Sequence, residues 1–408
     1  MCRNLELRGI SMAQQKKPYL KLARPISPDE QKRRKRHRRK EAVKRNMPLL
    51  VLVLMVLLGT YLLLINKSYT SVRSASVYPK STSDTNQYEP FAGGIVRYSR
   101  DGIALLNKKN EELWIQPSQI QDPIIDLNNQ SFAVADRGGN SILVFSPNGI
   151  KGEIETTLPI EKITVSNQGI VSAILKDENN PMIVTYDATG NILVENQIAL
   201  NTLGYPTALE LSDDGTVLGA AYLSINGGML KSRVIYYNFA NSDQEANNFE
   251  VSQAEYDNTV VADIFFMNSA TWVCVTDHSF LFYEGKDKPV PKQTVELERE
   301  IRSVFYTGRC IGCVLLNKEK SGYEIQLYNR QGRQVMSREF AGEFDNVRMI
   351  GDNIIMHEGM NVCIISKTGI LRYKGRLEVE PLLMIPAAGI NRYYVMSANE
   401  LRIIYLTN

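Results

Sequence analysis

The sequence predicts an all-β protein, an eight-bladed β-propeller that follows a single N-terminal transmembrane helix. Three observations lead to this prediction. An uncharged apolar run extends from Met47 to Ile65. Beyond Pro90 the chain consists of short runs rich in Val, Ile, Tyr and Phe, which are separated by turn residues and show almost no helical periodicity. Among these runs a strand-and-turn unit recurs about every 40 residues, which is a spacing typical of propeller blades.

The apolar run predicts a transmembrane signal-anchor helix over residues 47–66. A hydrocarbon core of about 30 Å needs about 20 helical residues to cross it. The run from Met47 to Ile65 contains nine Leu, three Val and no charged residue, so its insertion into a bilayer is favourable. Pro48 lies in the first helical turn, where its missing N–H removes no helical hydrogen bond. We therefore expect an integral membrane protein with one span.

Charge differs strongly between the two sides of this run. Residues 1–46 hold sixteen Lys and Arg against four Asp and Glu, a net charge of +12, whereas the remainder carries −9. Positive charge beside a span stays in the cytoplasm, so we expect a disordered basic tail inside and the C-terminal part outside the membrane. The cluster between Lys32 and Lys40 could instead bind nucleic acid, and Ser74-Ala75-Ser76 could be a signal cleavage site. The long apolar run beside this cluster favours a membrane anchor over both alternatives. We therefore expect no nucleic-acid partner.

Eight turn positions predict the number of blades. At each of them an apolar strand leads, through a four-residue step, to a Gly or Asn, the residues that adopt positive φ at little cost in a tight hairpin. The positions are 37 to 51 residues apart and predict eight blades over residues 93–408, with seven as the alternative. They are Asn110, Gly149, Gly190, Asn241, Gly285, Gly332, Gly369 and Asn408.

The two ends of the predicted propeller are expected to meet in one blade. The last blade reaches its turn position at Asn408 and so lacks a fourth, outer strand. Residues 67–92 are rich in Ser, Thr and Asn and are predicted to be a linker, but Val72 to Tyr78 within them alternates like a strand. An unpaired edge strand is prone to aggregation, so residues 72–78 are expected to pair with the last blade and close the ring. The alternative is that they are linker only.

Residue patterns of known catalytic and metal sites do not occur. His278 and His357 are not part of HExxH or of another metal-ligand spacing, and no GxSxG, GxxxxGK or strand-linked GxGxxG is found. Asp277-His278-Ser279 contains the residue types of a triad, but chain neighbours cannot adopt its converging geometry. Asp213-Asp214 precedes Gly215 and is explained by a β-turn. We therefore predict no catalytic residue, no metal site and no cofactor.

The cysteines are predicted to be structural. Cys310 and Cys313 form a CxxC, but positions three apart on a strand point to opposite faces, so their thiols would diverge. No second CxxC is present to complete a zinc site. We expect Cys274, Cys310, Cys313 and Cys363 to pack as small apolar residues.

Two segments carry a resemblance to a known family. GGIVRYSRDGIALLNKKNEELW and GYPTALELSDDGTVLGAAYL, together with the basic tail, the span and the linker, resemble an uncharacterised family of membrane-anchored, extracytoplasmic β-propeller-like proteins of Gram-positive bacteria. The resemblance implies an extracytoplasmic propeller and no known activity. More loosely, ALLNKKNEELW and TYDATGNILV resemble the repeats of quinone-dependent dehydrogenases and of outer-membrane assembly propellers, although only one unit carries the Trp, at Trp114.

Together these observations favour a membrane-tethered binding or scaffold module, not an enzyme, with a protein or cell-envelope partner. The alternative is an enzyme that uses the central pocket of the propeller, possibly with a quinone. Partners are expected where the loops between second and third strands meet the blade-to-blade loops, because surface loops commonly carry function. The expected binding residues are Arg137, Tyr205, Tyr222, His278 and His357, and the polar loops of this face are Arg100-Asp101, Asp136-Arg137, Lys176-Asp177, Asp277-His278, Asn317-Lys318, His357-Glu358 and Asn399-Glu400.

Overall fold

The structure consists of two compact units, which divide between Ile65 and Asn66. The basic tail, residues 1–46, lies outside the described part of the chain. The computed structural model describes residues 47–64, 66–79, 86–177, 181–198, 200, 202–240, 248–317, 322–342 and 344–408.

The first unit contributes one helix, Met47–Leu64, which is long and apolar enough to cross a membrane. The hydroxyl of Thr60 in this helix turns back onto the backbone and donates to the carbonyl of Val56 at 2.9 Å. Such back-bonding satisfies a polar group that would otherwise face an apolar surrounding. The helix agrees with the predicted single span.

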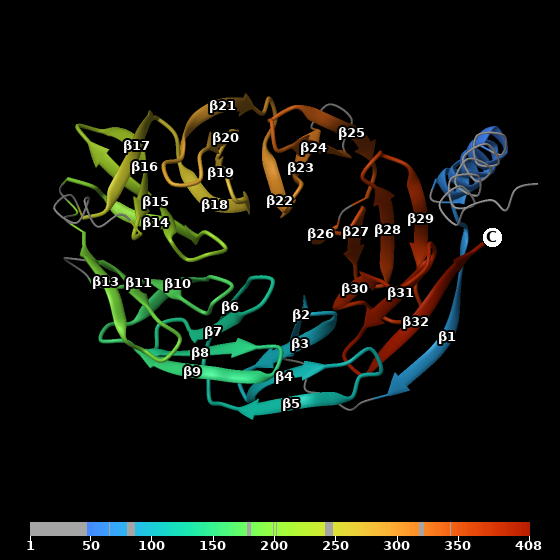
Figure 1. Ribbon diagram of the computed structural model, residues 1–408, viewed down its shortest axis with the longest axis horizontal. Helices are drawn as coiled ribbons and strands as arrows, with labels where there is room; N and C mark the ends of the chain where they lie inside the picture. Colours follow the sequence, from blue (N-terminus) through green and yellow to red (C-terminus); the bar gives the residue numbers. More distant parts are fainter. Residues whose placement is uncertain are drawn as a thin grey trace, which may run out of the picture. The chain divides into compact units, whose positions relative to one another are not determined.

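The second unit is an eight-bladed β-propeller, as the sequence predicts (Figure 1). Each blade is a four-stranded antiparallel sheet, and in the first seven blades the strands follow one another in chain order from the innermost to the outermost. Blades 1 to 4 comprise β2 (Gln87–Phe91), β3 (Gly94–Ser99), β4 (Gly102–Leu106) and β5 (Glu112–Pro117); β6 (Pro123–Leu127), β7 (Phe132–Asp136), β8 (Ser141–Ser146) and β9 (Gly149–Glu155); β10 (Ile160–Val165), β11 (Val171–Leu175), β12 (Met182–Tyr186) and β13 (Ile192–Gln197); β14 (Tyr205–Leu211), β15 (Val217–Asn226), β16 (Met229–Asn238) and β17 (Glu250–Asp257).

The remaining four blades continue the ring in the same way, and the eighth is completed by a strand from the start of the unit. Blades 5 to 8 comprise β18 (Val261–Asn268), β19 (Thr271–Thr276), β20 (Ser279–Glu284) and β21 (Val290–Glu296); β22 (Ile301–Thr307), β23 (Cys310–Asn317), β24 (Gly322–Asn329) and β25 (Gln334–Phe340); β26 (Asn346–Ile350), β27 (Asn353–Glu358), β28 (Asn361–Ser366) and β29 (Leu371–Arg376); β30 (Leu383–Pro386), β31 (Arg392–Met396), β32 (Glu400–Thr407) and β1 (Ser71–Pro79).

Strand β1 closes the ring. It pairs antiparallel with β32 from Ser71, opposite Thr407, to Pro79, opposite Glu400, so the strand expected at residues 72–78 completes the last blade. The chain is already tied to the ring before β1 begins, because the N–H of Tyr69 donates to the carbonyl of Arg372 at 2.7 Å. The predicted linker 67–92 therefore contains two strands, β1 and β2, and the first blade begins at Gln87 instead of residue 93.

Six of the eight predicted turn residues have the positive φ that their chemistry suggests, whereas Asn408 does not. Asn110 has a φ of 63°, Gly190 of 93° and Gly369 of 83°, and each lies in the turn between the third and fourth strands of its blade. A side chain with a Cβ disfavours this left-handed region, which explains why Gly or Asn recurs there. Asn241 lies outside the described residues.

The core is divided into layers between neighbouring blades. In the layer between blades 1 and 2, the indole of Trp114 on β5 stacks on Phe145 with centroids 5.3 Å apart, and Phe145 stacks in turn on Phe132 at 4.8 Å. The indole N–H of Trp114 donates to the carbonyl of Pro147 at 3.1 Å, so its polar atom is satisfied while its rings are packed. Each sheet thus buries its two faces against its two neighbours, which a single blade could not do.

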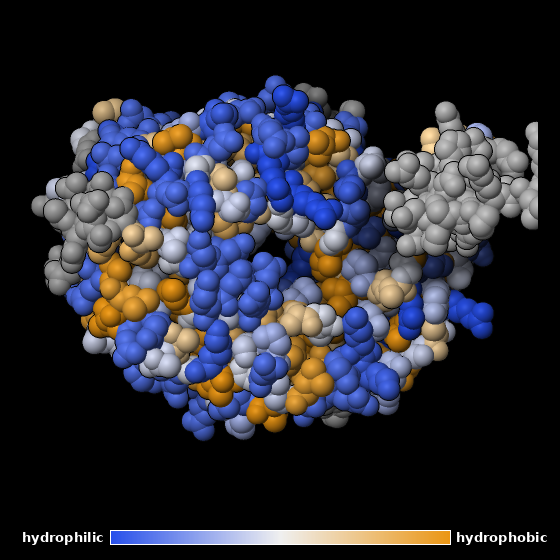
Figure 2. Space-filling model, in the orientation of Figure 1, coloured by the Kyte–Doolittle hydropathy of each residue, from blue (hydrophilic) through white to orange (hydrophobic). Residues whose placement is uncertain are grey.

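The ring has two faces, which we name by their loops. The connection face carries the blade-to-blade connections and the loops between second and third strands; the hairpin face carries the other two loops of every blade. At the hairpin face the N–H of Leu406 donates to the carbonyl of Asn391, which lies between β30 and β31. Because Ser71 lies opposite Thr407 at this same end of β32, the chain enters the ring at the hairpin face. Figure 2 shows an opening at the middle of the ring, with hydrophilic residues beside it.

Candidate functional site

The innermost strands bring ionisable side chains to the central channel. Asp126 on β6 accepts a hydrogen bond from the N–H of Val165 at 2.6 Å. Glu210 on β14 accepts from the hydroxyl of Thr164 at 3.2 Å. A cross-ring ion pair lies near them, because the ammonium of Lys162 on β10 is 2.8 Å from Asp263 on β18. Blades 2 to 5 therefore contribute a connected polar group to one side of the channel.

The two carboxyls of Asp126 and Glu210 hold protons more strongly than free ones. Burial raises the pKa of Asp126 to about 6, against the hydrogen bond from Val165, which lowers it. Burial also raises the pKa of Glu210 well above its usual value, and the negative charges of Asp126 and Asp263 raise it further. Like charges in a poorly solvated place cannot both ionise easily, so the two carboxyls lose their protons at higher pH than free carboxyls do.

A cavity of about 510 Å³ lies where this group meets the hairpin face. Its lining combines Glu210 and Asp213 with the rings of Phe91, Phe266 and Tyr306. The ring of Tyr306 stacks on Phe265, with centroids 3.8 Å apart, so one aromatic pair forms part of the channel wall. Apolar walls with a few carboxyls are typical of pockets for small molecules.

A second cavity, of about 570 Å³, opens near the connection face among blades 2, 3 and 4; we call it the connection-face cavity. Ile124, Ile163 and Pro206 contribute apolar wall, and Arg137, Lys162 and Tyr205 contribute polar groups. Glu161, which also lines the cavity, accepts a hydrogen bond from the hydroxyl of Tyr205.

Arg137 and Tyr205, two of the residues expected from the sequence, lie together in this cavity. The guanidinium of Arg137 is 2.7 Å from the Asp122 carboxylate, and both side chains remain about half exposed. Burial raises the pKa of Tyr205 to about 12, and its hydrogen bond with Glu161 acts in the same direction. The hydroxyl therefore stays protonated at physiological pH.

Tyr222 was expected to bind a partner, but the structure places it in the core. It lies on β15 with an exposed fraction of 1 % and its hydroxyl is 2.8 Å from that of Tyr237. The segment LGAAYL alternates as a strand whose side chains pack on both faces, so Tyr222 points into the core between blades and not to the rim. Tyr222 therefore cannot contact a partner without unfolding of the blade.

His357 was also expected at a binding surface, but the structure buries it, and His278 lies apart from the other expected binding residues. His357 lies on β27 with an exposed fraction of 7 %, opposite Asn346, and burial together with the nearby Arg348 lowers its pKa to about 4. It is therefore a neutral, largely buried residue. His278 lies in the β19–β20 loop of blade 5, half exposed, with its Nδ1 2.9 Å from Asp277. It is not part of the connection-face cavity.

The channel carboxyls are functional candidates that reasoning from the sequence missed. Their signal is a single acidic residue within an apolar inner strand, Asp126 in PIIDL and Glu210 in YPTALEL. A half-buried strand tolerates such a residue only where its side chain reaches water or a partner, which the channel provides. Among the residues that the structure describes, no group of three or more His, Cys, Asp or Glu side chains is placed to hold a metal ion.

The cysteines behave as predicted. Cys310 packs in the layer between blades 6 and 7, 3.5 Å from the sulfur of Met349, whereas Cys313 packs in the layer between blades 5 and 6. The two thiols of the CxxC therefore lie on opposite faces of β23. Cys274 and Cys363 are also free and buried.

Lys318, one of the polar loop residues, lies outside the described part of the chain. Most of the other expected loop residues lie in loops at the connection face, whereas Asp136, Asn317, His357, Glu358 and Glu400 belong to the adjoining strands. Only Arg137 among all of them lines the connection-face cavity.

Comparison with known proteins supports the fold and gives no activity. BamB from Moraxella catarrhalis is 12 % identical, with a TM-score of 0.51 over 82 % of this chain and 100 % of that one. Sqt1 from Saccharomyces cerevisiae is 11 % identical, with a TM-score of 0.49 over 83 % of this chain and 100 % of that one. No curated protein matches the sequence. Residues 65–406 match the model of a family of unknown function, DUF5711, and the chain belongs to this family.

Proposed function

We propose that this protein is a membrane-tethered, extracytoplasmic binding or scaffold module, which engages a protein or cell-envelope partner through the connection-face cavity. The single observation that carries the proposal is the meeting of Arg137 and Tyr205 over an apolar wall in a cavity of about 570 Å³. Arg and Tyr are the side chains that most often dominate binding energy, when they border a pocket from which water is displaced.

The position of the cavity supports this role. The chain enters the ring at the hairpin face, through Tyr69 and β1, and the cavity opens at the other face. A partner bound there meets the loops of blades 2, 3 and 4 and not the strand that leads to the anchor. The rigid blades keep the cavity preformed, which lowers the ordering cost of association.

The extracytoplasmic location rests on sequence. The net charge of +12 in residues 1–46 favours retention of the tail in the cytoplasm, beside the helix Met47–Leu64. The resemblance to anchored propellers of Gram-positive bacteria points in the same direction. With the tail inside, the ring that follows the helix is outside the membrane.

Site-specific crosslinking in intact cells tests the proposed surface. A photoreactive amino acid replaces Tyr205 at the cavity in one variant and Gln331, an exposed residue in a hairpin-face turn, in a matched control. We expect one defined adduct from position 205 and none from position 331. In the position-205 variant, Arg137→Glu should abolish the adduct, because a carboxylate there repels Asp122 and reverses the rim charge.

An equal yield from both positions, or an adduct that survives Arg137→Glu, would show that the connection-face cavity is not the binding surface. Comparable membrane abundance and melting temperature of the variants exclude misfolding as the cause of a lost adduct.

One observation favours a second candidate function, an enzyme of the central channel. Catalytic groups commonly carry perturbed pKa values, and Asp126 and Glu210 do so beside a cavity of about 510 Å³. Asp126, with a pKa of about 6, is suited to general acid or base catalysis near neutral pH. Incubation of the purified chain with cell-envelope extracts, compared with Asp126→Asn and Glu210→Gln variants, tests this role. Turnover by the wild-type chain alone would replace binding as the primary function.

A further inference from the structure

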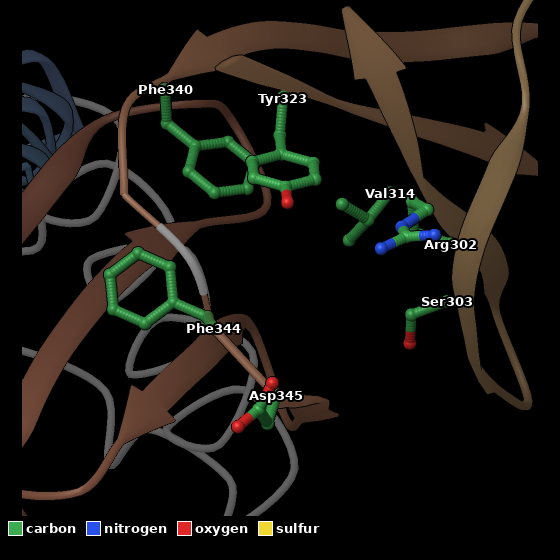
Figure 3. Close-up of a pocket in the computed structure, with 7 residues that line it drawn as sticks. All are labelled: Arg302, Ser303, Val314, Tyr323, Phe340, Phe344 and Asp345. Atoms are coloured by element: carbon green, nitrogen blue, oxygen red, sulfur yellow. The ribbon is translucent and has the colours of Figure 1, made fainter. Parts of the chain in front are cut away.

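A third cavity, of about 230 Å³, lies at the connection face between blades 6 and 7 and is distinct from the surfaces above. We call it the interblade pocket, and Figure 3 shows its seven lining side chains around an open centre. The residues come from five segments that meet at this point: β22, β23, β24, the end of β25 and the connection from β25 to β26. They are Arg302, Ser303, Val314, Tyr323, Phe340, Phe344 and Asp345.

Three aromatic rings form one side of the interblade pocket. Tyr323 and Phe340 stack with centroids 5.7 Å apart and an angle of 23° between their planes. Phe344 lies 5.9 Å from Phe340 at an angle of 42°. All three rings are only partly buried against the apolar layer between blades 6 and 7. They therefore keep part of their apolar surface at the pocket.

Arg302 and Ser303 lie across the pocket from Phe344, whereas Asp345 lies beside Phe344 (Figure 3). Within the described residues, the hydroxyls of Tyr323 and Ser303 and the carboxylate of Asp345 make no hydrogen bond to protein. The guanidinium of Arg302 is 3.3 Å from Glu300, both about half exposed, and forms no ion pair with Asp345 in the described part of the chain. Donors and acceptors thus remain available around the pocket beside the aromatic rings.

The combination restricts the chemistry of an occupant. It needs an apolar face for the rings and an edge that both donates and accepts hydrogen bonds. Its size is also limited, because about 230 Å³ is less than the roughly 300–1,000 Å³ of pockets for drug-sized molecules. A pyranose ring meets these requirements: its C–H face is apolar, and each of its hydroxyls both donates and accepts.

We propose that the interblade pocket binds a single pyranose unit of a glycan. The C–H face of the sugar lies against Phe344 and Phe340, while its hydroxyls donate to Asp345 and accept from Arg302. The hydroxyls of Ser303 and Tyr323 fit either direction of hydrogen bond. A zwitterionic amino acid could pair with Arg302 and Asp345, but it would leave the aromatic rings without an apolar face to cover, so we favour the sugar.

The interblade pocket shares no residue with the connection-face cavity or with the channel cavity. Sugar binding and partner binding are therefore separate properties, and either can fail without the other.

Ligand-observed NMR on the full chain in lipid nanodiscs tests the proposal. Nanodiscs are used because detergents with sugar head groups would compete for the site. Saturation-transfer experiments with N-acetylglucosamine, glucose and galactose, and with chitobiose as a short glycan, should show binding of at least one pyranose. Tighter binding of chitobiose than of N-acetylglucosamine would identify a glycan end, and equal binding a free monosaccharide. Glycine and alanine serve as the zwitterionic probes.

Variants assign the binding to the pocket. Phe344→Ala and Asp345→Asn should each weaken the bound pyranose about tenfold, and Tyr323→Phe, which removes one hydroxyl and keeps the ring, about fivefold. Arg309→Gln is the matched control for Arg302→Gln, because Arg309 lies exposed in the β22–β23 turn of the same blade, at the hairpin face. Arg302→Gln should weaken binding and Arg309→Gln should not.

Three results would overturn the proposal: no saturation transfer to any pyranose at millimolar concentration, unchanged affinity in Phe344→Ala and Asp345→Asn, or displacement of the pyranose by glycine or alanine at lower concentration. Melting temperatures of all variants show whether a loss of binding reflects a loss of fold. The conservative Tyr323→Phe variant keeps the test valid should Phe344→Ala unfold.

Discussion

Val72, in the first strand of the ring, lies directly opposite Leu406 in the last. Both side chains belong to the apolar layer between blades 7 and 8, where Leu406 is completely buried and Val72 packs against the same cluster. The pair joins segments more than 300 residues apart in the chain. Stability of the whole ring therefore depends on the strand that follows the apolar helix Met47–Leu64 in the chain.

Removal of β1 should open the ring. A truncated chain that starts at Ser68 keeps the strand, whereas one that starts at Asp84 loses the partner of β32 and exposes its unpaired N–H and C=O groups. We expect the longer chain to be monomeric with one cooperative unfolding transition, and the shorter chain to aggregate or to melt at lower temperature. Size-exclusion chromatography and calorimetry measure both properties. Equal solubility and melting temperature of the two would show that β1 contributes nothing to the fold.

Ring closure and blade number were accessible from the sequence because each leaves a local chemical mark. Gly190 and Gly369 mark turns that need positive φ, and the alternation of Val72 to Tyr78 marks a strand. The first blade was placed too late because QYEPF, which forms β2, contains Pro and two polar residues and lacks the usual alternation.

The burial of individual rim residues was less predictable from the sequence. Whether the side chain of a strand residue is buried depends on how the neighbouring blade covers it. Tyr222 and Tyr205 are both tyrosines near the same hairpin, yet one is buried against Tyr237 and the other lines a cavity. The channel group of Asp126 and Glu210 arises from strands 84 residues apart, and nothing local in either strand indicates the other.

Alanine variants of Tyr222 and Tyr205 should differ in their free energy of unfolding, because Tyr222 lies in the core and Tyr205 at the rim. Tyr222→Ala leaves a cavity and removes the partner of the Tyr237 hydroxyl, so we expect a loss of about 3–5 kcal/mol in the free energy of unfolding. Tyr205→Ala removes a partly exposed ring and should cost about 1 kcal/mol or less. Thermal or urea unfolding of the two variants beside the wild type provides the comparison. Similar losses in both would contradict the assignment of Tyr222 to the core.

The four cysteines of the ring should resist alkylation while the protein is folded. Burial raises the pKa of Cys274 and of Cys313 to about 12 and that of Cys363 to about 11, so almost no thiolate is present at pH 8. Iodoacetamide labelling followed by peptide mass spectrometry should show little modification in buffer and complete modification in denaturant. An oxidant should form no Cys310–Cys313 disulfide, because the thiols lie on opposite faces of β23. Rapid native labelling of Cys313 would contradict its burial.

We expect the charge difference around the helix Met47–Leu64 to set its orientation in the membrane. Protease added to intact spheroplasts should digest or release the ring and leave an epitope fused to residues 1–46 intact. Permeabilised cells serve as the control, in which the epitope also disappears. Protection of the ring in intact spheroplasts would reverse the proposed topology.

Stability should depend on pH through two buried groups that act in opposite directions. The pKa of Asp126 is raised to about 6 in the folded chain, so between about pH 4 and 6 the folded state binds more protons than the unfolded state. This contribution favours folding at low pH and is lost as the pH rises. The pKa of His357 is lowered to about 4, so between about pH 4 and 6.5 the unfolded state binds more protons. This contribution grows as the pH rises.

Single variants should resolve the two contributions in melting curves recorded from pH 4 to pH 7. Asp126→Asn removes the group that opposes folding when ionised, so its melting temperature relative to the wild type should increase with pH. His357→Gln removes the penalty of keeping a histidine neutral at low pH, so its relative melting temperature should be highest near pH 4 and fall toward pH 7. The raised pKa of Glu210 has the same sign as that of Asp126, and Glu210→Gln should therefore follow Asp126→Asn. Curves that run parallel to the wild type would show that neither the channel carboxyls nor His357 change protonation on folding.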